Sequence, residues 1–139
     1  MKDVKIPNWN SNGALPPINS ESPVSRDRSP YRASVFDFTM RFSTSPERRE
    51  ILKGYLLHRS RLHEIGILAG FQWLDGSFLE NIEIIEQRNP NDLDVVTFFH
   101  SPENSDILDT KTDIFDNKKV KDDFKIDSYF IELDQLNKN

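Results

Sequence analysis

Residues 71–99 read FQWLDGSFLENIEIIEQRNPNDLDVVTFF, and they contain the most informative pattern in the 139-residue chain. The segment 93–99 is a run of apolar, β-branched and aromatic residues with one aspartate in it, which is typical of a buried strand. Asp92 and Asp94 stand two positions apart, and strand side chains alternate between faces. Both carboxylates are therefore expected on one side of the strand, where they can hold a hard divalent cation.

A glycine–serine step lies upstream of this strand. Gly76 and Ser77 follow the apolar lead-in 71–74. A turn at such a step offers backbone N–H groups and a hydroxyl, which suit phosphate oxygens. The sequence therefore predicts a phosphate-binding turn beside a metal-binding strand.

A third aspartate, Asp127, lies inside a second strand-like run at 124–131. A carboxylate on an adjacent strand is what a two-metal site requires. The plainer interpretation is a solvated turn at 89–92, with Asp94 facing water. The combination of features favours the metal site.

The order Gly-Ser, then Asp-x-Asp on a strand, then a single Asp on a later strand resembles the DNA-polymerase-beta-like nucleotidyltransferase superfamily. More closely, WLDGSF at 73–78 and PNDLDVVTFF at 90–99 resemble an uncharacterised bacterial family of nucleotidyltransferase-like proteins. This closer resemblance extends from Ile6 to about Leu133. It implies an α+β fold: a minimal nucleotidyltransferase fold with a small mixed sheet flanked by helices and an extended N-terminal arm.

The resemblance also implies roles for individual residues. Carried over by position, Asp92, Asp94 and Asp127 are catalytic and bind Mg²⁺ or Mn²⁺, while Gly76 and Ser77 hold the nucleotide phosphates. The implied activity is a metal-dependent transfer of a nucleoside monophosphate from a nucleoside triphosphate, such as ATP, to a hydroxyl group. The acceptor is a protein, an RNA or a small molecule, and the sequence does not choose among them.

A second hypothesis comes from another functional class. The chain ends soon after Asp127, without the helical domain that usually follows in the superfamily. This favours a catalytically inactive module of the same fold that acts with a partner protein, as in a toxin–antitoxin or phage-defence pair. The retention of all three carboxylates favours the enzyme instead.

Length and composition predict one domain. The net charge of −5 argues against general nucleic-acid affinity, and the absence of cysteine excludes disulfides and thiolate metal sites. No signal-peptide or membrane-spanning pattern is present, so we expect a cytoplasmic protein without membrane association. Residues 1–30, rich in Pro, Ser and Asn, are expected to form an extended arm, and residues 31–139 the nucleotidyltransferase-like domain.

The arm contains apolar residues that a free tail would expose, and we expect it to pack over the domain: Ile6, Trp9, Leu15 and Ile18. Its downstream end is basic, through Arg26, Arg28 and Arg32, which either reach a phosphate or belong to a solvated loop.

The element pattern outside 71–99 is less regular. Residues 31–42 fit a strand or a short helix. Ser45 is a predicted N-cap for a helix that runs to about Glu64. The other face of that helix is basic and is expected either in solvent or as a groove for a polyanionic substrate: Arg48, Arg49, Lys53, Arg59 and Arg61. His58 and His63 do not share a helical face and are expected on the helix surface. Residues 101–119 read as a connection, and 118–133 as a strand.

Overall fold

The computed structural model describes residues 5–17, 31–102 and 113–133. In chain order the elements are α1 (Val35–Phe42), α2 (Pro46–Glu64), β1 (Gly70–Asp75), the 3₁₀ turn η1 (Ser77–Leu79), α3 (Ile82–Ile85), β2 (Leu93–Phe99), the 3₁₀ turn η3 (Asp113–Phe115), α4 (Asn117–Phe124) and β3 (Ile126–Glu132). The expected α+β class with a small mixed sheet is confirmed. None of the helices in these ranges has the length and apolar character that crossing a bilayer requires.

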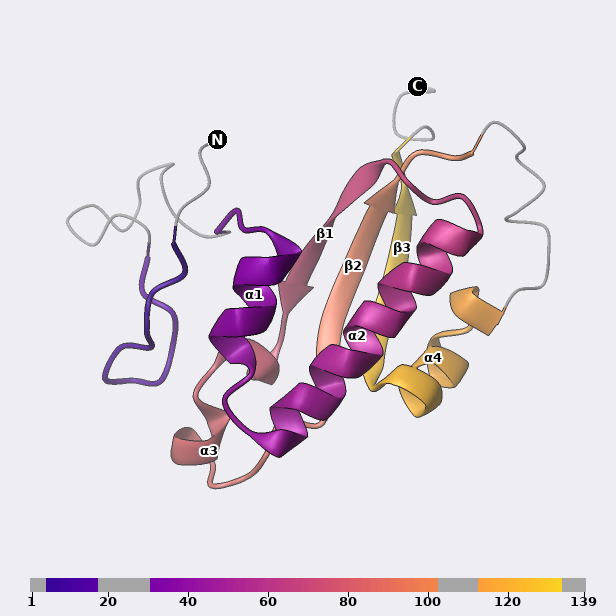
Figure 1. Cartoon of the computed structure of the whole chain (residues 1–139). Coiled ribbons are helices and arrows are strands. Elements are labelled where there is room, and N and C mark those ends of the chain that lie inside the picture. Colours follow the sequence, from indigo (N-terminus) through magenta and orange to yellow (C-terminus); the bar gives the residue numbers. More distant parts are fainter. Residues whose placement is uncertain (1–4, 18–30, 103–112, 134–139) are drawn as a thin grey trace.

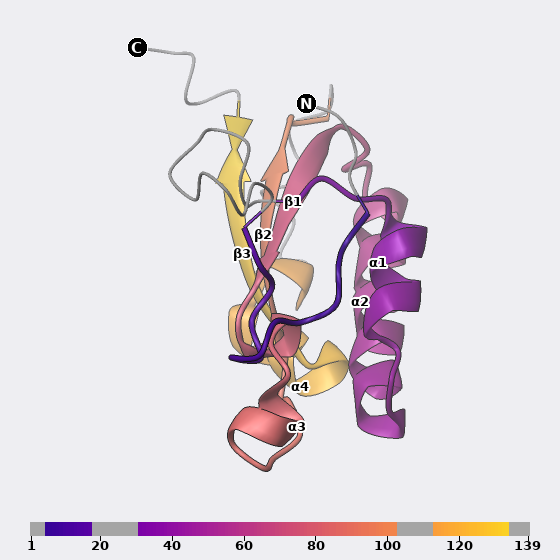
Figure 2. The same cartoon turned by 90° about the vertical axis from the view of Figure 1, so that its left-hand side faces the viewer.

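The sheet has the strand order β1-β2-β3, with β1 antiparallel and β3 parallel to the central strand β2. The predicted strand at 93–99 is confirmed. Its side chains alternate, with Leu93, Val95, Thr97 and Phe99 buried and the intervening ones less so. Helices α1 and α2 lie on one face of the sheet, and no helix of the described residues covers the opposite face (Figures 1 and 2).

Helix α2 begins as predicted, because the Ser45 hydroxyl accepts a hydrogen bond from the Arg48 amide and Pro46 occupies the first helical position. It ends at Glu64, also as predicted. Gly54 lies where α2 meets the end of α4, since a Cβ at this position would lie 2.0 Å from the Phe124 carbonyl oxygen. Residues 31–42, which fit either a strand or a short helix in the sequence, contain helix α1.

The described part of the arm packs against the domain. Ile6, Trp9 and Leu15 are partly buried against the core, and the Trp9 indole donates a hydrogen bond to the Leu79 carbonyl at 2.7 Å. The guanidinium of Arg41 lies 4.4 Å from the centre of the Trp9 ring. These contacts agree with the expected packing; of the other arm residues named above, Ile18, Arg26 and Arg28 fall outside the described residues.

The predicted strand at 118–133 is wrong in its first half, which forms α4. The Asp116 side chain caps this helix by accepting from the Lys119 amide at 3.2 Å, and Lys125 ends it in the left-handed conformation. The run between them has one fully buried apolar residue, Val120, while Phe124 is only partly buried against the core. One buried residue is too weak a periodic signal to indicate a helix from sequence.

Two residues expected on the solvent-facing side of α2 are buried instead. Arg48 lies under η1 and α3, and the ring of His58 lies against Phe124 and Phe130. The prediction failed because α2 is contacted from several directions. The η1–α3 segment covers its first turn, and α4 with β3 covers its middle.

Candidate functional site

Three aspartates lie side by side across the sheet. Asp75 at the end of β1 pairs with Asp94 on β2, and Asp94 pairs with Asp127 on β3. Directly opposed residues on neighbouring strands point to the same side of a sheet, so these three carboxylates share one side. We call Asp75, Asp94 and Asp127 the acidic row. Asp92 precedes β2 and stands on the same side as Asp94 by strand alternation.

Asp94 is the centre of this arrangement. Partial burial raises the pKa of its carboxyl, and the charges of Asp92, Asp127 and Asp75 raise the pKa further, while Lys121 acts in the opposite sense. A carboxylate surrounded by three others concentrates negative charge. A cation bound there would relieve that repulsion.

Lys121, on α4, supplies one positive charge. Its ammonium group lies 3.2 Å from Asp92 Oδ2. The hydrogen bond and the charge of Asp92, followed by the charges of Asp127 and Asp94, raise the pKa of this amine. Nothing in the sequence pattern indicated this partner, because α4 itself was not predicted.

Asp127 is held by two neighbours. The side-chain amide of Asn117 donates to Asp127 Oδ1 at 2.9 Å and also to the Ser128 carbonyl at 2.8 Å. The Tyr129 hydroxyl donates to Asp127 Oδ2 at 3.2 Å, and the Asp127 charge raises the pKa of that phenol. The carboxylate orientation is therefore set from both sides.

The Gly76–Ser77 turn lies directly against Asp94. Gly76 has φ +94°, and its amide donates to Asp75 Oδ1 at 2.8 Å. A Cβ at Gly76 would lie 2.8 Å from Asp94 Oδ2, closer than real Cβ contacts permit. Ser77 then opens η1. The positive φ favours glycine here, and a side chain at this position would also have to displace the Asp94 carboxylate.

Replacing Gly76 with alanine should lower the free energy of unfolding by about 1–3 kcal/mol, because a positive φ and the contact with Asp94 both penalise a side chain. Urea denaturation measures this change. Gly66→Ala is the matched control, since Gly66 has a similar φ of +92° at the end of α2, away from the acidic row. Equal losses in the two variants would show that the contact with Asp94 is of no consequence.

Asp94→Asn should raise the melting temperature at neutral pH. Folding raises the pKa of Asp94, so the folded chain holds that proton more tightly than the unfolded chain. The destabilisation of the folded state by the charged Asp94 carboxylate is therefore fully present above the pKa of Asp94 in the folded chain. It disappears below the pKa of Asp94 in the unfolded chain. Thermal melts at pH 7 and pH 3 should show stabilisation of a few degrees at pH 7 and none at pH 3. A lower melting temperature at pH 7 would contradict the repulsion.

The structure brings the predicted site residues together at one end of the sheet: Asp92, Asp94, Asp127, Gly76 and Ser77. As the side chains stand, no three or more His, Cys, Asp or Glu residues in the described ranges are arranged to hold one metal ion. Sequence reasoning missed Asn117 and Tyr129 as partners of Asp127. Asp75 was also not among the predicted site residues, although it stands immediately before Gly76 in the sequence.

These features define a small α+β domain with a row of carboxylates and a glycine–serine turn at one end of a mixed sheet. The chain belongs to a family of unknown function (DUF6932), which it matches over residues 7–139. No curated protein and no solved structure matches the chain.

Proposed function

We propose that the chain is a metal-dependent nucleotidyltransferase, which moves a nucleoside monophosphate from a nucleoside triphosphate to a hydroxyl group of a protein, an RNA or a small molecule. The observation that carries the proposal is the position of Asp94. This residue lies in register with Asp127 on one side, and the Gly76–Ser77 turn lies against it on the other.

The donor set suits Mg²⁺ or Mn²⁺, because both ions prefer oxygen ligands and the surplus negative charge at Asp94 needs a counter-ion. Asp92, Asp94 and Asp127 are the residues that would hold the metal. Bound there, it would supply the positive charge that stabilises the phosphoryl oxygens during transfer.

The chain's own residues have distinct tasks in this proposal. The Ser77 hydroxyl binds the terminal phosphates, which leave as pyrophosphate. Asp127 accepts the proton of the attacking hydroxyl. Asn117 and Tyr129 act as positioning residues, since both donate hydrogen bonds to that carboxylate.

One observation favours the second hypothesis, an inactive module of this fold that works with a partner protein. The ammonium group of Lys121 already pairs with Asp92, where a metal would lie in the enzyme. An enzyme must exchange that contact when it takes up a metal–nucleotide complex, whereas an inactive module keeps it.

Incubation with labelled nucleoside triphosphates, Mg²⁺ and a cell extract tests the proposal. We expect label on an acceptor with the wild-type chain and none above background with Asp94→Asn. Asp122→Asn is the matched control, because Asp122 is exposed on α4 and the substitution makes the same chemical change. Labelling that persists in Asp94→Asn would contradict the enzyme proposal. Nucleotide binding without transfer would favour the inactive module.

A further inference from the structure

The face of the sheet opposite α1 and α2, which no helix of the described residues covers, carries an apolar surface next to the acidic row. It consists of two cross-strand rows, which we call the aromatic face: Trp73, Val96 and Tyr129 in the first row, and Phe71, Phe98 and Ile131 in the second. The strand register puts these residues on the same side as the three aspartates.

The large side chains of this face are open to solvent. Phe71, Trp73 and Tyr129 are 51%, 53% and 54% exposed. They are also ordered by one another, since Phe71 stacks on Phe98 at 4.7 Å and Trp73 meets Phe98 edge-on at 5.0 Å. Soluble monomers rarely leave a contiguous apolar surface of this kind exposed unless it binds something.

The aromatic face and the acidic row form one continuous surface. Trp73 lies two residues along β1 from Asp75, which is about 7 Å of strand. Tyr129 joins the two regions directly, because its ring belongs to the first row while its hydroxyl donates to Asp127. A ligand held at the carboxylates would extend naturally over these rings.

The charges on the strands restrict the class of ligand. The three strands contain no Lys or Arg, so they offer nothing to the phosphate backbone of a long nucleic acid. The surface instead suits a molecule with one end that binds carboxylates through a metal and another that is flat and uncharged. A single nucleotide has both ends.

We propose that the aromatic face binds the base of the nucleotide, with Trp73 as the principal stacking residue. This inference rests on the proposed function, because it requires the triphosphate to lie at the acidic row. Purines should bind more tightly than pyrimidines, since their larger rings bury more surface on the aromatic side chains.

The test compares ATP, CTP and inorganic tripolyphosphate, each with Mg²⁺, by calorimetry. Stacking of one base contributes about 1–3 kcal/mol, so ATP should bind the wild type about 5- to 150-fold more tightly than tripolyphosphate does. Trp73→Leu should abolish this gain and leave tripolyphosphate binding unchanged, and Trp73→Phe should restore much of it. Phe36→Leu is the matched control, because Phe36 is an exposed aromatic residue on α1.

Fluorescence gives a second measurement, since Trp9 and Trp73 are the two tryptophans of the chain. ATP should quench the wild type and leave the Trp73→Leu variant, which retains Trp9, unchanged.

If ATP and tripolyphosphate bind the wild type equally and both require Asp94, the base does not bind this face, and the proposed function is retained. If Trp73→Leu weakens the binding of both ligands equally, the inference about the aromatic face is also wrong. If neither ligand binds the wild type, both the inference and the proposed function are wrong.

Discussion

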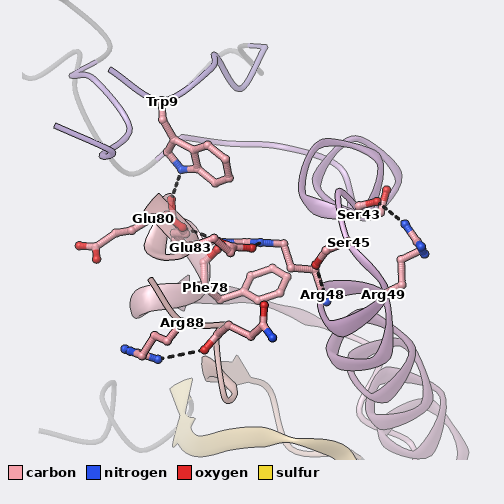
Figure 3. Close-up of polar contacts among 11 residues, drawn as sticks. Trp9, Ser43, Ser45, Arg48, Arg49, Phe78, Glu80, Glu83 and Arg88 are labelled. Atoms are coloured by element: carbon pink, nitrogen blue, oxygen red, sulfur yellow. Dashed lines mark hydrogen bonds and ion pairs between the residues drawn. The ribbon is translucent and has the colours of Figure 1, made fainter. Parts of the chain in front are cut away.

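Replacing Arg48 with alanine is expected to lower the free energy of unfolding by about 3–5 kcal/mol. The Arg48 side chain is completely buried, and its guanidinium binds the Glu83 carboxylate through Nε at 2.6 Å and Nη2 at 2.9 Å. It also donates to the backbone carbonyls of Phe78 at 2.6 Å and Glu80 at 2.7 Å (Figure 3). The substitution would leave these acceptors without their donor.

The Arg48 contacts bear on the site as well as on stability. The two carbonyls belong to the segment that follows Ser77, so Arg48 fixes the Gly76–Ser77 turn to the first turn of α2. Its hydrogen bond is also the largest influence that lowers the pKa of Glu83. In Arg48→Ala the pKa of Glu83 should therefore rise toward its ordinary value.

Urea denaturation of Arg48→Ala and Arg49→Ala checks this account. Arg49 is the matched control, because it is exposed and donates one hydrogen bond, to the Ser43 carbonyl (Figure 3). Its substitution should change the free energy of unfolding by no more than about 0.5 kcal/mol. Similar losses in both variants would mean that the buried network contributes little.

Acidification should destabilise the chain through His58. This residue is fully buried in α2, and burial, with a smaller contribution from the charge of Arg59, lowers its pKa from 6.5 to about 4. Between these values the unfolded chain binds a proton that the folded chain does not. The contribution of neutral His58 is thus present above pH 6.5 and lost as the pH falls to 4, by about 3 kcal/mol in total.

Free energies of unfolding at pH 7 and pH 4.5 measure the effect in wild type, His58→Leu and His63→Gln. His58→Leu should reduce the loss on acidification, because leucine suits the contacts with Phe124 and Phe130 and does not titrate. His63 is exposed at the end of the same helix, so its substitution should retain the wild-type loss. An unchanged acid response in His58→Leu would assign the pH dependence to other groups.

Sequence patterns correctly predicted those helices and strands that residues close together in the chain are enough to indicate. Strand β2 follows from a run of apolar, β-branched and aromatic residues that contains one aspartate, and α2 follows from a serine cap followed by helical spacing. Helix α4 has one buried residue and gave no such signal. Arg48 and His58 were assigned to solvent because spacing identifies the most apolar face of a helix, and it cannot indicate that other elements also cover the polar face.

Only the part of the candidate site that lies within one strand could be predicted from the sequence. Asp92 and Asp94 belong to one strand, so alternation alone puts them together. The positions of Asp75 and Asp127 on either side of Asp94 depend on strand order and register, which pairwise tertiary contacts decide. Lys121 reaches Asp92 from a helix that the pattern did not indicate.

The most direct test of the central claim, that the acidic row and the Gly76–Ser77 turn form a metal–nucleotide site, is calorimetric titration with ATP in the presence and absence of Mg²⁺. We expect binding that requires Mg²⁺ and is lost in Asp94→Asn, while Asp122→Asn binds like the wild type. Equal ATP affinity with and without Mg²⁺, or binding that survives Asp94→Asn, would contradict the claim.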